Sequence, residues 1–170
     1  VVYNCGGYEK PEVIRLLDGY VDIYLPDLKY FDPELSARYS GARDYFAQAS
    51  QAVSAMISQT GSPVFDEDGI MQKGVIIRHM VLPGSRKDSI SILHWIREHL
   101  PEEGFLLSLL SQYTPFYKSR EYPQINRRLT TYEYDKVLEE AISLGLTRGF
   151  MQEKSSAKEE YTPPFDLEGL

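Results

Sequence analysis

The sequence predicts an α/β fold in which parallel strands form a sheet that helices cover. Apolar runs of strand length, at residues 21–28, 74–84 and 104–113, alternate with helical segments at 42–59 and 87–100. Strands of a buried parallel sheet are apolar along nearly their whole length, as these runs are. The order strand, helix, strand, helix is the pattern of a parallel sheet with helices packed against it.

The chain opens with a short strand and a short helix. Residues 1–4 are predicted to form a buried strand, which Gly6 and Gly7 bring to an end. Residues 10–17 are predicted to form a helix, with Pro11 in its first turn, where a missing N–H group costs nothing.

The next three elements are a strand and two helices. β-branched and aromatic residues at 21–28 favour a strand. Asp32, followed by proline and glutamate, predicts the start of a helix to about residue 39. A longer helix is expected at 42–59, where apolar residues recur every three or four positions. This core-facing stripe consists of Tyr45, Ala49, Ala52, Val53, Met56 and Ile57.

The middle of the chain continues the alternation. Residues 63–74 resemble a β-hairpin that turns on Asp68 and Gly69. Residues 74–84 are predicted to form the third main strand, and the segment 87–100 is predicted to be helical because its apolar residues fall on one face.

The last elements follow a long loop. Residues 104–113 are expected to form a fourth strand, and the segment 114–129, rich in tyrosine, proline and arginine, is expected to be a loop. Thr130 and Glu133 have the spacing of a capping box that opens the next helix. The sequence TRGFMQ at 147–152 is predicted to form the last strand.

Composition limits the classes of function. The 170 residues are enough for one α/β domain, predicted at 1–152, followed by a charged tail at 153–170. A net charge of −7 argues against nucleic-acid binding, because no basic surface could neutralise phosphates. No apolar run approaches the roughly 20 residues that a membrane span needs. A single cysteine, Cys5, is consistent with a reducing cytoplasm.

The first residues, VVYNCGGYE, begin without methionine and directly in an apolar strand. We therefore expect the chain to be the downstream part of a longer polypeptide. The strand at 1–4 would then be an open sheet edge, whose unpaired N–H and C=O groups favour self-association.

Asp27 and Lys29 end the strand predicted at 21–28, and ligands bind at the carboxyl ends of strands in open parallel sheets. Residues i and i+2 of a strand point to the same face, so both side chains are expected to lie together. The pair is either an ordinary salt bridge or an acid and an ammonium that flank an amino-acid-like ligand. Lys29 is also a candidate Schiff-base nucleophile of a barrel lyase.

Arg78 and His79 interrupt the apolar strand at 74–84. A guanidinium in a buried strand needs a carboxylate or a ligand, and the nearest candidates are Asp27 and a substrate. His79 is expected to point to the opposite face, as a core histidine with a hydrogen-bond partner.

Polar residues also end the first and fourth strands. Asn4 and Cys5 precede the two glycines, which either form a simple turn or let the backbone approach a ligand. Gln112 and Tyr113 end the fourth strand. Each signal is weak alone, but together the strand ends predict a binding site at one edge of the sheet.

Five stretches carry a resemblance to a known family: VYNCGGYE, VDIYLPDLKYFDP, GVIIRHMVLPG, LLSQYTPFY and YPQINRRLT. In combination they resemble the radical S-adenosylmethionine proteins related to pyruvate formate-lyase activating enzyme, and in particular an uncharacterised branch of activating-enzyme homologues. The resemblance extends to about Gly149.

The resemblance implies a partial (β/α)6 TIM barrel whose strand ends hold a 4Fe-4S iron–sulfur cluster and S-adenosylmethionine. It also implies an oxidoreductase that cleaves S-adenosylmethionine reductively to a 5'-deoxyadenosyl radical. That radical abstracts hydrogen, from a glycine of a partner glycyl-radical enzyme or from another protein substrate. By the same resemblance, the residues that bind S-adenosylmethionine are Asn4, Cys5, Asp27, Lys29, Arg78 and Gln112.

The chain departs from this family in its cysteines. The family binds its cluster through a Cys-x-x-x-Cys-x-x-Cys loop, and this sequence has one cysteine. The cluster ligands are therefore expected upstream of this chain, which should be inactive alone. The alternatives are a non-catalytic α/β binding domain and a barrel lyase that uses Lys29 as its Schiff-base lysine.

Overall fold

Six strands form one sheet in the computed structural model of the protein, which describes residues 1–151. They are β1 (Val2–Cys5), β2 (Ile23–Pro26), β3 (Val64–Phe65), β4 (Met71–Met80), β5 (Leu106–Leu110) and β6 (Gly149–Met151). Their order is β1-β2-β4-β5-β6 with every neighbouring pair parallel, and β3 pairs antiparallel with β4. The predicted parallel α/β fold is confirmed, while the tail predicted at 153–170 lies outside the described residues.

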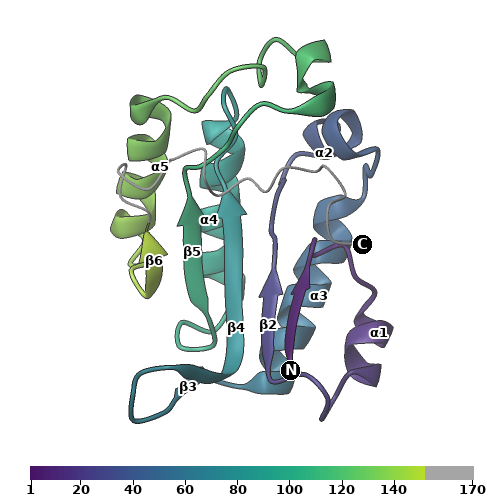
Figure 1. Ribbon diagram of the computed structural model, residues 1–170, viewed down its shortest axis with the longest axis vertical. Coiled ribbons are helices and arrows are strands. Elements are labelled where there is room, and N and C mark those ends of the chain that lie inside the picture. Colours follow the sequence, from purple (N-terminus) through teal and green to yellow (C-terminus); the bar gives the residue numbers. More distant parts are fainter. Residues whose placement is uncertain (152–170) are drawn as a thin grey trace, which may run out of the picture.

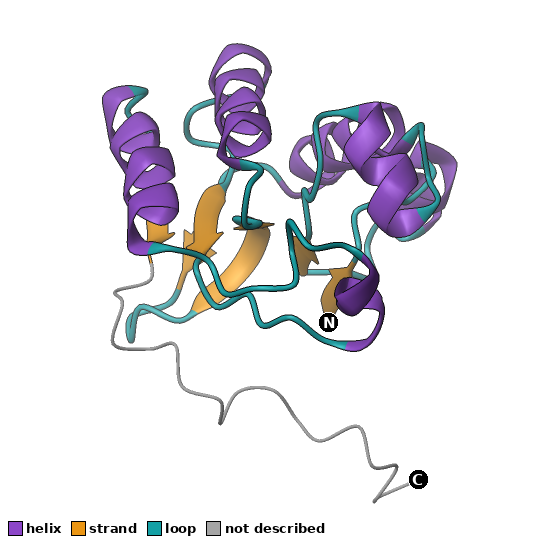
Figure 2. Ribbon diagram, turned by 90° about the horizontal axis from the view of Figure 1, so that it is seen from above, coloured by secondary structure: helices purple, strands orange, loops and turns teal. Residues whose placement is uncertain are grey.

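The α-helices lie on one side of this sheet, and the described residues place no α-helix on the other side (Figure 2). They are α1 (Pro11–Leu16), α2 (Pro33–Ser40), α3 (Tyr45–Thr60), α4 (Arg86–His99) and α5 (Thr131–Ser143). None of the helices between residues 1 and 151 combines the length and the hydropathy of a membrane span. The sheet therefore has one covered face and one bare face.

The register of β2 against β4 decides which residues face the helices. Tyr24 pairs with Val75, and both are fully buried, as is Ile77. Because side chains alternate along a strand, Asp27 and Arg78 lie on the opposite, bare face. The main core therefore fills the space between the sheet and the helices, and the charged residues lie outside it.

Local signals in the sequence explain where several elements begin and end. The carboxylate of Asp32 accepts the Glu34 N–H group at the start of α2, and Thr130 and Glu133 form the predicted capping box of α5. The predicted hairpin at 63–74 is also confirmed, because β3 pairs with β4 around Gly69, whose φ is +77°.

The predicted strands differ from the structure in bounds or in burial. β4 begins and ends earlier than the predicted 74–84, and β5 is shorter than the predicted 104–113. β1 is not buried: it is an edge strand whose Val2 is 58% exposed, because it has one neighbour and no helix on the bare face. β2 ends at Pro26, which has no N–H group to donate, although an isolated bridge between Asp27 and Arg78 extends the pairing.

The carboxyl ends of the parallel strands lie at one edge of the sheet, as Figure 1 shows at its top. The connection from β5 to α5, residues 111–130, passes over this edge and contains the short 3₁₀ helix η1 (Tyr117–Glu121), which was predicted only as loop (Figure 1). Its Tyr122 ring packs edge-on against Tyr39 of α2, with the centroids 5.3 Å apart. The connection at residues 111–130 therefore contacts α2 at the same edge of the sheet as Asp27.

Candidate functional site

Asp27 lies between two cations at the carboxyl end of β2. Its Oδ1 accepts hydrogen bonds from Arg78 Nε at 2.9 Å and from Arg78 Nη2 at 2.6 Å. Its Oδ2 lies 3.6 Å from Lys29 Nζ. The predicted pairing of Arg78 with Asp27 is confirmed, and so is the proximity of Asp27 to Lys29. We call Asp27, Lys29 and Arg78 the charged trio.

The backbone of β2 and β4 sets this geometry. Asp27 bridges Arg78 across the sheet, and the Leu28 N–H group donates to the Arg78 carbonyl at 2.8 Å. On the other side, the Asp27 N–H group donates to the Cys5 carbonyl at 2.9 Å. The acidic residue is therefore fixed between two strands, and its side chain points to the bare face.

The charged trio is partly open to solvent and carries one positive charge in excess. The side chains of Asp27, Arg78 and Lys29 are 24%, 29% and 44% exposed, respectively. Partial burial strengthens electrostatic interactions, while the exposed fraction leaves all three side chains accessible from solvent. An arrangement of one carboxylate, one ammonium and one guanidinium can hold a group that carries both an anion and a cation.

The turn after β1 lies directly against the charged trio. Gly7 has φ of +80°, and a Cβ atom there would lie 2.0 Å from the Asp27 carbonyl oxygen. A Cβ atom at Gly6 would lie 3.8 Å from Lys29 Nζ, so the ammonium reaches over this turn. Gly7 is therefore needed for this close approach, whereas a Cβ atom at Gly6 would meet Lys29 only at an ordinary van der Waals distance.

Asn4 and Cys5 are on opposite faces of β1. Asn4 pairs with Leu25, so its exposed side chain shares the bare face with Asp27. Cys5 pairs with Pro26 and packs against the core, and burial raises the pKa of its thiol. Cys5 thus contributes its backbone carbonyl, rather than its sulfur, to this part of the site.

Gln112 lies two residues beyond the end of β5, at the same edge of the sheet. It is half-buried, and within residues 1–151 no hydrogen bond joins it to the charged trio. Its neighbour Tyr113 donates to the Ile125 carbonyl at 2.9 Å, which fastens the long connection. The structure therefore brings Gln112 to the same edge, without a hydrogen bond to the charged trio among the described residues.

His79 belongs to the core, as predicted. It is 1% exposed, and its Nδ1 lies 2.6 Å from the Leu28 carbonyl, so this nitrogen carries the hydrogen. Burial lowers the pKa of His79 to about 4, so the ring is neutral at pH 7. Its Nε2 has no partner among the described residues.

Tyr45 was predicted only as a core residue, yet its hydroxyl reaches the site. The hydroxyl oxygen lies 2.8 Å from the Gly6 carbonyl and 2.9 Å from the Asp27 carbonyl, and it accepts the Lys29 N–H group at 3.1 Å. One signal could have shown this role: a buried tyrosine needs a hydrogen-bond partner for its hydroxyl.

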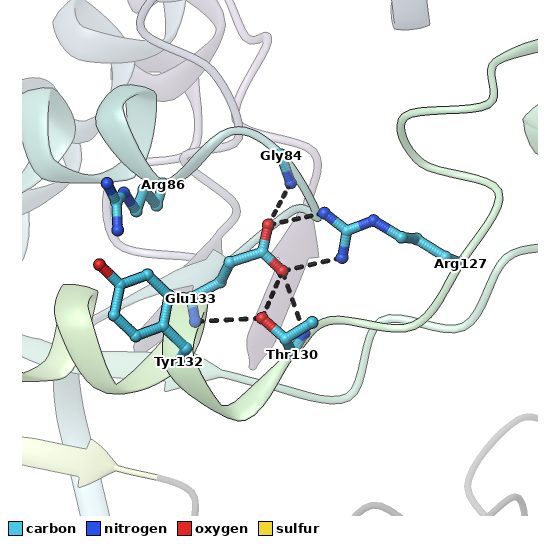
Figure 3. Close-up of a pocket in the computed structure, with 6 residues that line it drawn as sticks. All are labelled: Gly84, Arg86, Arg127, Thr130, Tyr132 and Glu133. Atoms are coloured by element: carbon cyan, nitrogen blue, oxygen red, sulfur yellow. Dashed lines mark hydrogen bonds and ion pairs between the residues drawn. The ribbon is translucent and has the colours of Figure 1, made fainter.

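A separate hollow of about 360 Å³ lies where the segment after β4 meets the start of α5 (Figure 3). Its lining residues are Gly84, Arg86, Arg127, Thr130, Tyr132 and Glu133. Figure 3 shows the Glu133 carboxylate bound by Arg127, by the Gly84 N–H group at 2.7 Å and by Thr130. These contacts, Arg127 above all, hold the pKa of Glu133 well below its usual range. Glu133 thereby ties the long connection to the segment after β4.

The residues present do not fit an iron–sulfur cluster. Such a cluster in the family needs three thiolates, and the sequence contains one cysteine. Within residues 1–151, no group of three or more His, Cys, Asp or Glu side chains is arranged to hold a metal ion.

Comparison with known proteins adds one relative. No family model matches the chain, and no solved structure matches it. The chain is 36% identical over 140 residues to an uncharacterised protein of Methanocaldococcus jannaschii. This match covers 82% of the chain but only 37% of the archaeal protein. The chain thus spans little more than a third of that relative's length.

Proposed function

We propose that this chain is the S-adenosylmethionine-binding part of a radical S-adenosylmethionine enzyme related to pyruvate formate-lyase activating enzyme. The observation that carries the proposal is the convergence of Asp27, Lys29 and Arg78 at one strand end. The sequence motifs that suggested the family contain these three residues. The cluster ligands are absent from this chain, so we expect no activity from it alone.

The bare face of the sheet supports a partial (β/α)6 barrel. In such a barrel the helices lie outside, and the site lies at the carboxyl ends of the strands. Here all α-helices described lie on one face of the sheet (Figure 2). Alternation along β2 and β4 puts Asp27 and Arg78 on the other face, opposite the buried Tyr24 and Ile77. A cofactor held by the charged trio would thus lie on the inner face of the barrel.

The chemistry of the trio fits the methionine part of S-adenosylmethionine. The carboxylate of the methionine part can accept hydrogen bonds from Arg78 and Lys29, and its ammonium can donate to Asp27. When bound beside a reduced cluster, this cofactor supplies the radical that abstracts hydrogen in the family. The role of this chain's residues is to bind and orient the zwitterion. The proposal includes a cytoplasmic location and a partner, which is a glycyl-radical enzyme or another protein substrate.

The test is a titration of the ¹⁵N-labelled chain with S-adenosylmethionine and, separately, with 5′-methylthioadenosine, which lacks the amino-acid part. We expect S-adenosylmethionine to shift the amide signals of Asp27, Lys29 and Arg78. 5′-Methylthioadenosine cannot make the charge-assisted contacts, so its affinity should be lower by a factor of about ten or more. Equal affinities would show that the trio does not hold the zwitterion, and absence of binding would contradict the cofactor assignment.

The alternative lyase mechanism depends on Lys29 as a nucleophile. A Schiff-base lysine needs a neutral amine, which desolvation or a neighbouring cation favours and a neighbouring carboxylate opposes. Lys29 is instead 44% exposed and lies 3.6 Å from a carboxylate, which favours the binding role. Borohydride reduction in the presence of pyruvate distinguishes the two, because only a Schiff base would leave a covalent adduct on Lys29.

A further inference from the structure

Two segments that carry the candidate site meet at the hydroxyl of Tyr45. One is the turn after β1, which follows Asn4 and Cys5, and the other is the end of β2, which carries Asp27 and Lys29. Tyr45 belongs to neither, because it is the first residue of α3. A helix on the covered face therefore reaches both segments through one side chain.

The hydroxyl of Tyr45 contacts three backbone groups. It lies within donating distance of two carbonyl oxygens, Gly6 at 2.8 Å and Asp27 at 2.9 Å. It also accepts the Lys29 N–H group at 3.1 Å. Burial raises the pKa of Tyr45, so the hydroxyl keeps its proton and can donate. These contacts join the turn directly to the segment on either side of Leu28.

The ring of Tyr45 is held independently of its hydroxyl. It stacks on Tyr8 with the centroids 5.9 Å apart, and Tyr30 packs edge-on at 5.4 Å. The residue is 3% exposed and forms part of the core. Phenylalanine would keep this packing, so the effect of the hydroxyl can be measured by itself.

We propose that Tyr45 is the positioning residue of the candidate site, whose hydroxyl fixes the turn after β1 against the end of β2. It thereby sets where Lys29 Nζ and the Asp27 carboxylate lie relative to the turn. Tyr45 does not touch the ligand and acts through these backbone groups. The link to S-adenosylmethionine rests on the proposed function, whereas the positioning itself does not.

The test compares Tyr45→Phe with Tyr24→Phe. Tyr24 is a matched control because it is fully buried and also donates one hydrogen bond, to Gln59 at 2.6 Å, away from the charged trio. In Tyr45→Phe the Lys29 amide loses its acceptor, so its hydrogen exchange should accelerate about tenfold or more. Alkylation of the single thiol, Cys5, should accelerate as the turn loosens. Neither rate should change in Tyr24→Phe beyond what its lower stability explains.

Affinity for S-adenosylmethionine gives the second readout. We expect Tyr45→Phe to weaken binding about tenfold, because Lys29 and Asp27 would no longer be held in the orientation that the ligand needs. Tyr24→Phe should leave the affinity unchanged. Unchanged exchange at Lys29 and unchanged thiol reactivity in Tyr45→Phe would overturn the positioning role. If these rates change but the parent chain binds no S-adenosylmethionine, the positioning stands and the cofactor assignment fails.

A second variant tests the same contact if Tyr45→Phe does not fold. Gly7→Ala places a methyl group 2.0 Å from the Asp27 carbonyl oxygen and 3.1 Å from the Tyr45 hydroxyl, so it forces the turn off both, whereas Gly19→Ala, at φ of +77°, meets no atom within 4 Å. Both carry the strain of a left-handed alanine, so they differ mainly in the clash. Faster Lys29 exchange in Gly7→Ala than in Gly19→Ala supports the proposal, and equal exchange contradicts it.

Discussion

Arg78 binds one carboxylate oxygen of Asp27 with two of its nitrogens and leaves the other oxygen to Lys29. The Nη1 group of Arg78 has no partner among the described residues. The guanidinium can therefore hold Asp27 in place and still donate to an anion from the bare face of the sheet. This division fixes the carboxylate between both cations and leaves the charged trio with one positive charge in excess.

Replacing Arg78 with methionine should destabilise the protein by about 1–3 kcal/mol, because Asp27 would lose a charge-assisted contact in a partly buried place. Arg43→Met is the matched control, since Arg43 pairs with Glu34 where both side chains are more than 60% exposed. An exposed pair is worth under about 1 kcal/mol. Urea unfolding of both variants checks the difference, and equal losses would show that the Arg78 contact is no stronger than a surface pair.

Glu133→Gln should lower the free energy of unfolding at pH 7 by about 1–3 kcal/mol, through its contacts with Arg127 and Gly84. The pKa of Glu133 is lowered in the folded protein, so its charge stabilises the fold above the ordinary value of 4.5. That stability is lost as the pH falls toward the folded pKa. The difference in the free energy of unfolding between the parent chain and the variant should therefore shrink below pH 4.5. Urea unfolding at a series of pH values measures this difference.

The control for that prediction is Glu139→Gln. Glu139 pairs with Lys136 on the surface of α5 and is 61% exposed. Its replacement should change stability by less than about 1 kcal/mol at every pH. A gap for Glu133→Gln that stays constant down to pH 3 would contradict the role of the charge.

His79 should make the fold sensitive to acid. Its pKa is about 4 in the folded protein, against 6.5 for an exposed histidine, so between these values the unfolded chain binds a proton that the folded chain does not. Stability should then fall by up to about 1.4 kcal/mol per pH unit as the pH drops from 6.5 to 4. Guanidinium unfolding at several pH values should show that stability falls less steeply with pH in His79→Gln than in the parent chain. In the exposed variant His99→Gln, stability should fall as steeply as in the parent chain.

The edge strand β1 should favour self-association. Val2 is 58% exposed on the outermost strand, and a charge there opposes strand pairing between molecules. Light scattering should show a larger mean mass for the parent chain than for Val2→Lys at high protein concentration. Leu16→Lys, on a helix and 78% exposed, controls for a general gain in solubility. A parent chain that stays monomeric would contradict this prediction.

The sequence was sufficient to predict the charged trio, because two local rules apply to it. Alternation along a strand puts Asp27 and Lys29 on one face, and a guanidinium in an apolar strand needs a carboxylate. The pairing of Arg78 with Asp27 needed only the further assumption that their strands are neighbours. The structure confirms that β2 and β4 pair.

The role of Tyr45 could not be predicted in the same way. Its helical spacing correctly places its ring in the core, and periodicity says nothing about the hydroxyl. The exposure of β1 was missed for a related reason. An apolar strand indicates burial on average, but an edge position and a bare face depend on neighbours that the local sequence does not specify.

Gly7 and Gly19 both have a left-handed backbone conformation, yet we expect related sequences to vary at position 19 and not at position 7. Asparagine and aspartate tolerate this backbone conformation well, so position 19 should drift among these residues across related genes. Position 7 faces the Asp27 carbonyl, where any side chain would collide. Purifying selection should therefore keep glycine at position 7 in every relative that retains the charged trio.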